Sequence, residues 1–281
     1  ELVEEFARRY GRIGWSPLVR ITVAQAEALE RELGADFRVA AGMRFSLPTI
    51  AEAVEVLAAA GAERLVGICL SPQWSPLLMG GYARALEEAV AALARPVPFA
   101  VAGAWHREPA FVDALAERVR EALGRLGPDA DRVPVLLTAH SLPKRVFESE
   151  PDYVAQLRET GELVAARAGL APERWRWAYQ SAGHTAEEWL RPDLKELFPS
   201  LVAEGHRDVL VAPVQFLSDH LEVLYDLDVA AAKEAASSGL RYHRIEMPNT
   251  QPAFIRALAA VVRTESGGAT GPRPALARRA R

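Results

Sequence analysis

Short apolar runs recur along the chain and are separated by polar stretches. Strands with one exposed face alternate apolar and polar residues. These runs do not alternate, so they predict strands of a parallel sheet that is buried on both faces. Four runs have the length of such a strand, at 64–70, 97–101, 133–138 and 208–213.

Stretches rich in Ala, Leu, Glu and Arg lie between these runs, and their apolar residues recur at helical spacing. The predicted helices cover 22–33, 49–60, 81–93, 109–126, 153–168 and 220–236, and a last one covers 252–263. Strands and helices therefore alternate, which is typical of the α/β class with right-handed crossovers. The chain length and the number of strands favour two similar α/β lobes with a hinge near 101–106.

The two ends of the chain differ from this pattern. Residues 264–281 are rich in Gly, Pro, Ala and Arg without an apolar period, which predicts a disordered basic tail. Position 1 is not Met, and residues 1–10 have the pattern of the middle of a polar helix. We therefore expect a segment upstream of this start.

Composition narrows the class of protein. Half of the 281 residues are apolar, which predicts a large core and excludes a disordered or fibrous chain. The 33 Lys and Arg against 37 Asp and Glu give a net charge of −4, so nucleic acid is not an expected partner. Cys69 is the single cysteine, which excludes an internal disulfide and an all-cysteine metal cluster. An acidic start and the lack of a long apolar run predict a cytoplasmic protein without an integral membrane segment.

Candidate chemistry lies where predicted strands end, because ligands of open parallel sheets bind at the carboxyl ends of the strands. Polar residues follow three of the runs, at 71–75, 138–143 and 213–222. His140 stands at the second of these places, where an imidazole can exchange protons near neutral pH or bind a transition metal. The alternative is a core histidine that is hydrogen-bonded to the backbone.

The third place leads into an acidic helix. Ser218 or Asp219 is a plausible N-cap, and from there Glu222, Asp226 and, in a π-bulged turn, Asp228 can share one face. The alternative is a solvated acidic first turn that the helix dipole favours. On a regular helix His220 and Glu222, two positions apart, point to different sides and make a poor metal pair.

The remaining motifs are less informative. Four histidines lie in polar surroundings, where surface positions are expected: His106, His184, His206 and His243. There is neither a Gly-rich phosphate fingerprint nor a Walker loop in the sequence, which disfavours nucleotide chemistry.

A series of motifs runs from about Arg9 to Val262. The main ones are TAHSLP at 138–143, YQSAGHTAEEWLRPDL at 179–194 and PVQFLSDHLEVLYDLD at 213–228, and smaller ones lie at 13–18, 42–45 and 247–255. In this order they resemble the ferrochelatases, and among them the soluble bacterial coproporphyrin type.

The resemblance implies two Rossmann-like lobes around a porphyrin cleft, with parallel sheets flanked by helices as in chelatases. We expect a first lobe over 1–104, completed by a helix at 249–263, and a second lobe over 105–248. The implied enzyme is a lyase of haem biosynthesis that inserts Fe²⁺ into a porphyrin, with coproporphyrin III preferred to protoporphyrin IX. It is expected to be a monomer whose partners are its two substrates, with no cofactor beyond the substrate iron and no iron–sulfur cluster.

The resemblance also implies a set of site residues. It places His140 at the chelation centre and Glu222 across the macrocycle, both as catalytic residues and as metal ligands. Inserting Fe²⁺ releases two pyrrole protons, so the site needs a base against the ring face and an exit for protons, and a neutral His140 can serve as that base. Asp226 continues a path for protons or metal toward solvent. The expected porphyrin contacts are Ser16, Met43, Gln73, Tyr82 and Trp189.

Some features depart from the family, and two alternatives stay open. Family members begin with a strand and a Tyr-Gly-Thr-Pro-type loop, so about forty to fifty residues are expected to be absent here. Gln73 stands where relatives often carry His. One alternative is a catalytically silent porphyrin- or haem-binding protein of the same fold. The other is a cobalt or sirohydrochlorin chelatase, which would be expected to use a pair of histidines and which the TAHSLP and SDHLE motifs disfavour.

Overall fold

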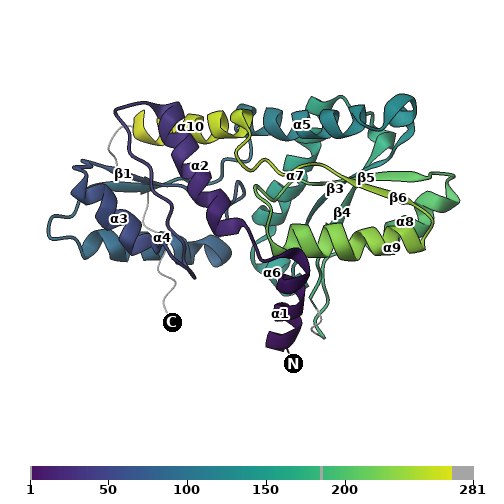
Figure 1. The fold of residues 1–281 in the computed structure, drawn as a ribbon, viewed down its shortest axis with the longest axis horizontal. Coiled ribbons are helices and arrows are strands. Elements are labelled where there is room, and N and C mark those ends of the chain that lie inside the picture. The colour runs from purple at the N-terminus through teal and green to yellow at the C-terminus, as the bar shows by residue number, and fades with distance from the viewer. Residues whose placement is uncertain (1, 184–185, 268–281) are drawn as a thin grey trace.

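The chain folds around two parallel β-sheets. The computed structural model describes residues 2–183 and 186–267 (Figure 1). A two-stranded sheet pairs β1 (Leu65–Gly67) with β2 (Phe99–Val101). A four-stranded sheet has the order β4-β3-β5-β6, with the strands β3 (Val135–His140), β4 (Trp175–Gln180), β5 (Asp208–Pro213) and β6 (Arg241–Arg244). All of these pairings are parallel.

The two-stranded sheet is accompanied by three helices, α2 (Leu18–Leu33), α3 (Ile50–Ala59) and α4 (Pro76–Ala91). Helix α3 begins at a capping box, in which the Thr49 side chain accepts the Glu52 N–H and the Glu52 carboxylate accepts the Thr49 N–H. Val54 of α3, Leu65 of β1 and Val90 of α4 form a small buried core. The sheet and its helices therefore bury apolar surface of their own.

The four-stranded sheet is covered on both faces. Val135 and Leu137 of β3 pack in one core, while Leu136 between them packs in a second core. The first core also takes in α5 (Pro109–Gly124) and α7 (Pro151–Ala168). The second includes α8 (Leu194–Ala203), the π-helix η3 (Glu222–Ala231) and α9 (Ala232–Ser237). Because neighbouring residues of a strand point to opposite faces, two apolar faces give an apolar run without alternation.

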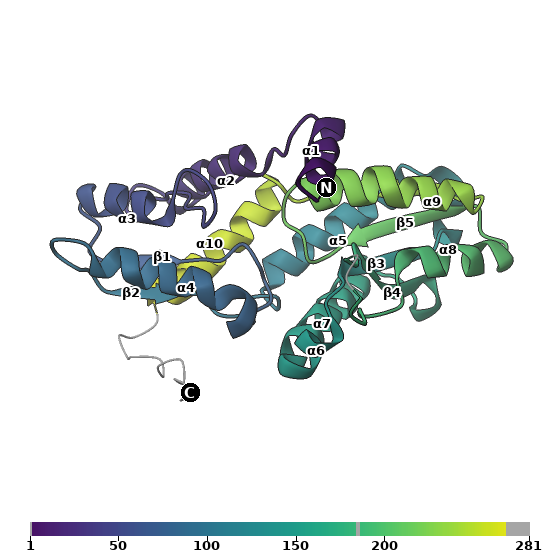
Figure 2. The same cartoon turned by 90° about the horizontal axis from the view of Figure 1, so that it is seen from below.

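The last helix connects the two parts of the molecule. Helix α10 (Pro252–Gly267) packs against α2, β1 and α5. In Figure 2 it runs beside the two-stranded sheet and leads toward α5, which lies with the four-stranded sheet. It also extends through residues 264–267, where a disordered tail was expected. The rest of that expected tail, 268–281, lies outside the described residues.

The remaining elements are short or peripheral. Helix α1 (Leu2–Ile13) protrudes between the two halves in Figure 1 and contacts η3. Helix α6 (Lys144–Ser149) follows β3, and two 3₁₀ turns, η1 (Gly127–Arg132) and η2 (Pro172–Arg174), precede β3 and β4. In the part of the chain that the structure describes, no helix is both long enough and apolar enough to span a bilayer.

The predicted α/β class is confirmed, and a strand overlaps each of the four predicted runs, although β3 extends two residues past the run at 133–138. Two strands were missed, β4 and β6, which are the edges of the four-stranded sheet. Their residues, WRWAYQ and RYHR, include side chains that are half-buried or exposed. An edge strand is only partly covered, so its sequence lacks the continuous apolar run of a central strand.

Candidate active site

His140 is the last residue of β3, at the carboxyl edge of the four-stranded sheet. Its Nδ1 atom lies 2.5 Å from the carbonyl oxygen of Ser141. A carbonyl can only accept a hydrogen bond, so Nδ1 carries a proton, and in the neutral ring Nε2 holds the lone pair. Nε2 lies 3.8 Å from Oε1 of Glu222, and the His140 side chain is 27% exposed. The backbone therefore orients the ring so that its basic nitrogen faces the carboxylate. The expected placement of Glu222 across the macrocycle from His140 is wrong, because 3.8 Å leaves no room for a porphyrin ring between the two groups.

His220 holds the other oxygen of the same carboxylate. Its Nε2 atom lies 2.7 Å from Oε2 of Glu222, and its Nδ1 atom lies 2.9 Å from the carbonyl oxygen of Ser218. Both ring nitrogens thus face acceptors, and an imidazole that donates from both nitrogens is a cation. The ring of Phe216 packs edge-on against the imidazole with centroids 4.6 Å apart. The geometry describes an ion pair of His220 with Glu222.

The pKa shifts have the signs of such a pair. Burial raises the pKa of Glu222, but the hydrogen bond from His220 and the charges of His220 and His140 outweigh it, so the net shift is downward. Burial lowers the pKa of His220, but the hydrogen bond and charge of Glu222 reverse the direction and raise it. Each group therefore favours the charged form of the other.

The expectation that His220 and Glu222 point apart is wrong. It assumed a helix from an N-cap at Ser218 or Asp219, whereas η3 begins at Glu222 and His220 lies in the non-helical turn before it. Helical spacing therefore does not apply to this pair.

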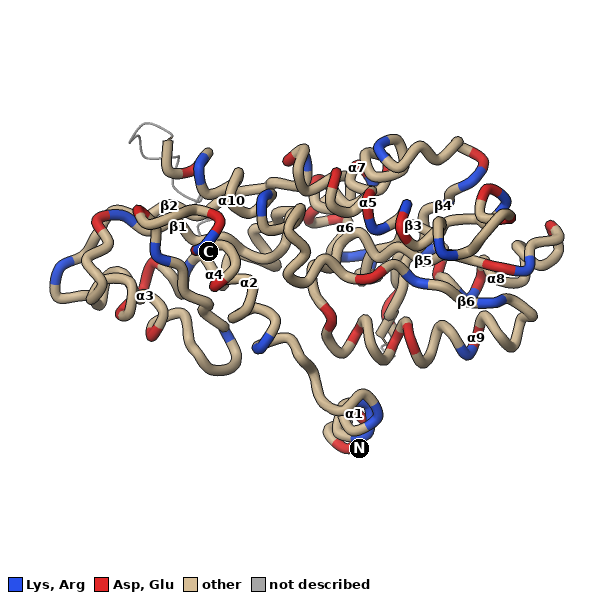
Figure 3. The backbone as a smooth tube through the Cα atoms, turned by 45° about the horizontal axis from the view of Figure 1, so that its top comes forward, with Lys and Arg blue, Asp and Glu red and all other residues tan. Residues whose placement is uncertain are grey.

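The expected acidic face is only partly present on η3. Asp226 faces α1, where its Oδ1 lies 3.5 Å from Arg9. Burial raises the pKa of Asp226, although a hydrogen bond with Ser181 and the charge of Arg9 oppose the shift. Asp228 instead binds Arg244 of β6 with both oxygens, at 2.6 and 2.8 Å, so it does not share a face with Asp226. Figure 3 shows the acidic positions spaced along the helix that ends in α9.

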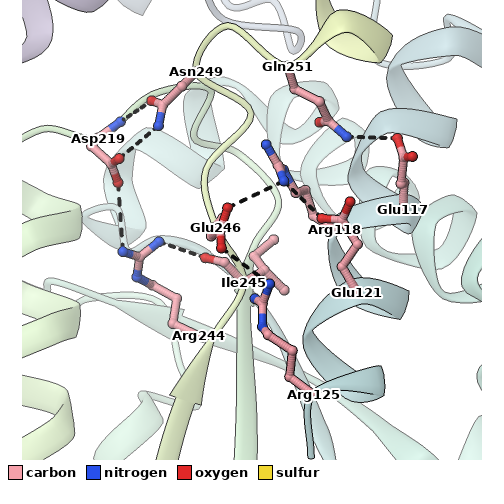
Figure 4. A network of polar contacts seen from close by, with 10 residues as sticks. All are labelled: Glu117, Arg118, Glu121, Arg125, Asp219, Arg244, Ile245, Glu246, Asn249 and Gln251. Carbon is pink, nitrogen blue, oxygen red and sulfur yellow. Dashed lines mark hydrogen bonds and ion pairs between the residues drawn. The ribbon is translucent and has the colours of Figure 1, made fainter.

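The turn that carries His220 is fastened from outside its own segment (Figure 4). The Asp219 N–H donates to Asn249 Oδ1 at 2.9 Å, and Asn249 Nδ2 donates to Asp219 Oδ2 at 2.8 Å. Arg244 lies 3.7 Å from Asp219 Oδ1. Gln25 of α2 donates to the Asn249 carbonyl at 2.8 Å. Residues far apart in the sequence therefore set the position of His220.

The expected porphyrin contacts occupy several places. Ser16 lies just before α2, where its Oγ accepts the Leu18 N–H at 3.3 Å. Met43 lies in the segment before α3 and is half-buried. Tyr82 of α4 is 37% exposed. Trp189 forms a backbone bridge with Pro143, three residues beyond His140. The role of these four residues stays a prediction.

Gln73 requires a correction. Its side chain is fully buried, and its Nε2 donates to Thr160 Oγ1 of α7 at 2.9 Å. A buried amide that is bonded within the protein presents no surface to a porphyrin. The structure thus makes Gln73 a contact between the segment after β1 and α7.

The histidines expected at the surface are not alike. His106 is 5% exposed and lies 2.8 Å from Glu159, so it is buried beside a carboxylate and the expected surface position is wrong for it. His206 and His243 are partly exposed, as expected, and His184 lies outside the described residues.

Two residues near these features were not among the expected site residues. Arg44 lies over the rings of Phe45 and Tyr82, and its guanidinium occupies the space where Gly81 lacks a side chain. The GMRF motif and the Gly80-Gly81 pair could have suggested this contact. Gln215 binds the backbone of His140 at 2.7 Å, which no spacing rule predicts.

Two side-chain atoms of this site, one nitrogen and one oxygen, can act as metal ligands. His140 Nε2 and Glu222 Oε1, 3.8 Å apart, can both contact one divalent ion, since such bonds are about 2.0–2.2 Å long. Among residues 2–183 and 186–267, no group of three or more His, Cys, Asp or Glu is arranged to hold a metal ion. Burial raises the pKa of Cys69 to about 11, so its thiol stays protonated.

Comparisons with known proteins bear on this geometry. The family model described as "Ferrochelatase" matches residues 1–266. A ferrochelatase of Deinococcus radiodurans is 39% identical over 266 residues, which cover 93% of this chain and 84% of that protein. A coproporphyrin III ferrochelatase of Geobacillus kaustophilus is 38% identical over 270 residues, again with 93% and 84% covered.

The fold of this chain is similar to that of solved chelatase structures. The structure of SirB from Bacillus subtilis with Fe³⁺ has a TM-score of 0.61 at 15% identity, and the match covers 86% of this chain and 89% of that one. The structure of CbiX, a terminal enzyme of sirohaem biosynthesis in denitrifying bacteria, has a TM-score of 0.59 at 13% identity and covers 88% and 92%. The fold is thus that of known chelatases.

Proposed function

This chain belongs to the ferrochelatase family, lyases that insert Fe²⁺ into a porphyrin, and we propose that coproporphyrin III is the porphyrin it takes. The support for the porphyrin is the name of several relatives, which are 36–38% identical to this chain. Coproporphyrin III carries propionates in place of the two vinyl groups of protoporphyrin IX, so the two substrates differ in charge at the edge of the ring.

The reaction exchanges protons for a metal without a redox step. Two pyrrole N–H bonds break, the four ring nitrogens bind Fe²⁺, and two protons leave. The site must therefore supply a base near the ring face and an exit for protons, and it must hold iron weakly enough to release it to the ring.

His140 is the base in this proposal. The observation that carries it is the orientation of its ring, with Nδ1 bonded to Ser141 and Nε2 directed toward Glu222. Nε2 is thus the nitrogen that accepts a pyrrole proton, and the resulting imidazolium lies beside a carboxylate. An imidazole together with one carboxylate also suits a borderline divalent metal such as Fe²⁺.

Glu222 stabilises that imidazolium in the same proposal. Its Oε2 is bonded to His220, which leaves Oε1 facing His140. The ion pair with His220 keeps the carboxylate charged while His140 gains and loses its proton. Asp226, one helical turn further along η3, gives a next acceptor toward α1, where Arg9 opposes the effect of burial on its pKa.

The test is metal insertion by the purified chain. Anaerobic Fe²⁺ is added with coproporphyrin III or with protoporphyrin IX, and the Soret band is followed. The proposal predicts turnover of both metal and ring, with a higher kcat/KM for coproporphyrin III. Tight porphyrin binding without turnover would instead identify a silent porphyrin-binding protein, and a preference for protoporphyrin IX would refute the proposed substrate.

A further inference from the structure

The backbone of His140 lies beyond the last residues of β3 that pair with β5. Successive N–H groups of a central parallel strand point alternately to the strands on either side. On the β4 side, the Ser141 N–H donates to the Gln180 carbonyl at 2.7 Å. On the β5 side, the paired residues end at Thr138 and Pro213, after which the chain turns away. The His140 N–H points to this side and has no strand to bind.

The side chain of Gln215 replaces the missing strand. Its Oε1 accepts the His140 N–H at 2.7 Å, and its Nε2 donates to the hydroxyl of Tyr153 at 2.9 Å. Because a backbone N–H can only donate, the amide oxygen must face His140 and the amide nitrogen must face Tyr153. The orientation of Gln215 is thus fixed at both ends.

The chain of hydrogen bonds continues to the segment after β1. Tyr153 of α7 is 1% exposed, and burial raises its pKa to about 12, so its hydroxyl keeps its proton. That hydroxyl accepts from Gln215 and also bonds Ser71, whose Oγ donates to the Gln73 carbonyl at 2.9 Å. The segment after β1 is thereby coupled to the end of β3.

We propose that Gln215 is a positioning residue for His140, which it holds through the backbone N–H so that Nε2 meets the reacting nitrogens of the porphyrin. This inference rests on the proposed role of His140 as the base. The ring of His140 is bonded to the Ser141 carbonyl, so a shift of the peptide at His140 moves the ring with it. Displacements of about 1 Å can cost roughly 100-fold in rate.

The same interface contains a matched control. Gln156, one turn from Tyr153 on α7, accepts the Trp74 N–H at 2.8 Å and donates to the Trp74 carbonyl at 3.3 Å. Thr160 binds Gln73 one turn further. The segment after β1 is therefore fastened to α7 without Gln215. Gln156 makes two hydrogen bonds, as Gln215 does, but neither reaches His140.

The experiment compares Gln215→Met, Gln215→Glu and Gln156→Met for insertion of Fe²⁺ and Zn²⁺ into coproporphyrin III. Met has a similar length and lacks both hydrogen bonds, whereas Glu keeps an acceptor oxygen for His140. We expect Gln215→Met to lower kcat roughly 10- to 100-fold with KM for the porphyrin within about threefold. Gln215→Glu should recover kcat to within about fivefold of the parent, and Gln156→Met should change it less than threefold.

Tyr153→Phe provides a variant that keeps the packing of the helix, and a loss of kcat smaller than that of Gln215→Met is expected. Equal losses in Gln215→Met and Gln215→Glu, or a kcat of Gln215→Met within twofold of the parent, would overturn the inference.

A spectroscopic measurement separates this inference from the proposed function. If the parent chain inserts no metal, the proposed function fails, but the ¹H–¹⁵N signals of the His140 imidazole can still be compared between the parent and Gln215→Met. Positioning predicts that these signals shift in Gln215→Met and stay in place in Gln156→Met. Unchanged His140 signals in Gln215→Met would refute it.

Discussion

Two clusters of imidazole and carboxylate groups lie at different edges of the four-stranded sheet. At its amino edge, Asp208 begins β5 and binds His243 of β6 at 2.9 Å and Arg241 through both oxygens at 2.6 and 2.8 Å. At its carboxyl edge, Glu222 binds His220 at 2.7 Å and has its other oxygen 3.8 Å from His140. Both clusters pair an imidazole with a carboxylate, and the first adds the guanidinium of Arg241.

They differ in whether an oxygen of the carboxylate remains available to a neighbouring imidazole. Both oxygens of Asp208 are taken by Arg241, whose charge does not change with pH, and the pKa of Asp208 falls to about 2. Glu222 has one oxygen bonded to His220, while the other meets a nitrogen that holds a lone pair. In the first cluster the guanidinium engages both carboxylate oxygens, whereas in the second Oε1 of Glu222 faces the nitrogen of His140 that accepts a proton in the proposed reaction. A short distance between histidine and carboxylate is therefore not enough to identify a catalytic pair.

The largest expected effect comes from His140→Ala. If Nε2 is the base, kcat for Fe²⁺ and Zn²⁺ insertion should fall by about 10²–10⁴-fold or more, because the imidazole also guides the metal. Porphyrin binding, measured by fluorescence quenching, should persist. His243→Ala is the matched control at the amino edge and should leave kcat within about twofold. If His140→Ala inserts metal at a rate within a few-fold of the parent, the assignment of catalysis to the carboxyl edge of the four-stranded sheet is contradicted.

Glu222→Gln should have a smaller effect of the same kind. The amide keeps the size of the side chain but cannot stabilise an imidazolium at His140 by charge, so we expect kcat to fall by roughly 10- to 100-fold. KM for the porphyrin should change less than about threefold in steady-state assays. Parallel losses of binding and rate would indicate that Glu222 shapes the cleft and has no role in the proton transfer.

Asp208→Asn should lower stability near neutral pH, lose this effect in acid, and leave the rate unchanged. The hydrogen bond from Arg241 holds the folded pKa of Asp208 at about 2, below its ordinary value of 3.8. A lowered pKa adds stability above the unfolded value, and this contribution is lost as pH falls from about 4 to 2. The parent should therefore melt about 1–2 °C above the variant near pH 6, since the pair is partly exposed. This difference should shrink as pH falls toward 2 and vanish below it, and a constant difference across this range would be evidence against the assigned pKa.

The sequence predicted the central strands because both faces of the sheet bury apolar side chains. Leu136 and Leu137 belong to different cores, and the resulting apolar run is visible without a structure. The edge strands β4 and β6 lack that signal. His140 was found for the same reason, since it directly follows the apolar run of β3.

The contacts around His140 could not be predicted, because long-range groups make them. Asn249 binds Asp219, which lies about thirty residues earlier in the sequence, and so fixes the turn that carries His220. In this turn His220 meets Glu222, although residues two apart on a regular helix point to different sides. Gln215 meets His140 only because β5 turns away before the end of β3. Local spacing carries no information on either contact.

The protonation of the two histidines beside Glu222 tests most directly whether His140 presents a basic Nε2 to a charged carboxylate. Long-range ¹H–¹⁵N NMR spectra, assigned with His140→Ala and His220→Ala, report which ring nitrogens carry protons. In the neutral ring of His140 we expect the Nδ1–H tautomer with an unprotonated Nε2, because Nδ1 donates to the Ser141 carbonyl. We also expect His220 to lose its second proton at a higher pH than free histidine, because Glu222 raises its pKa. A proton on Nε2 of neutral His140, or a His220 that titrates at or below the ordinary value, would contradict these assignments.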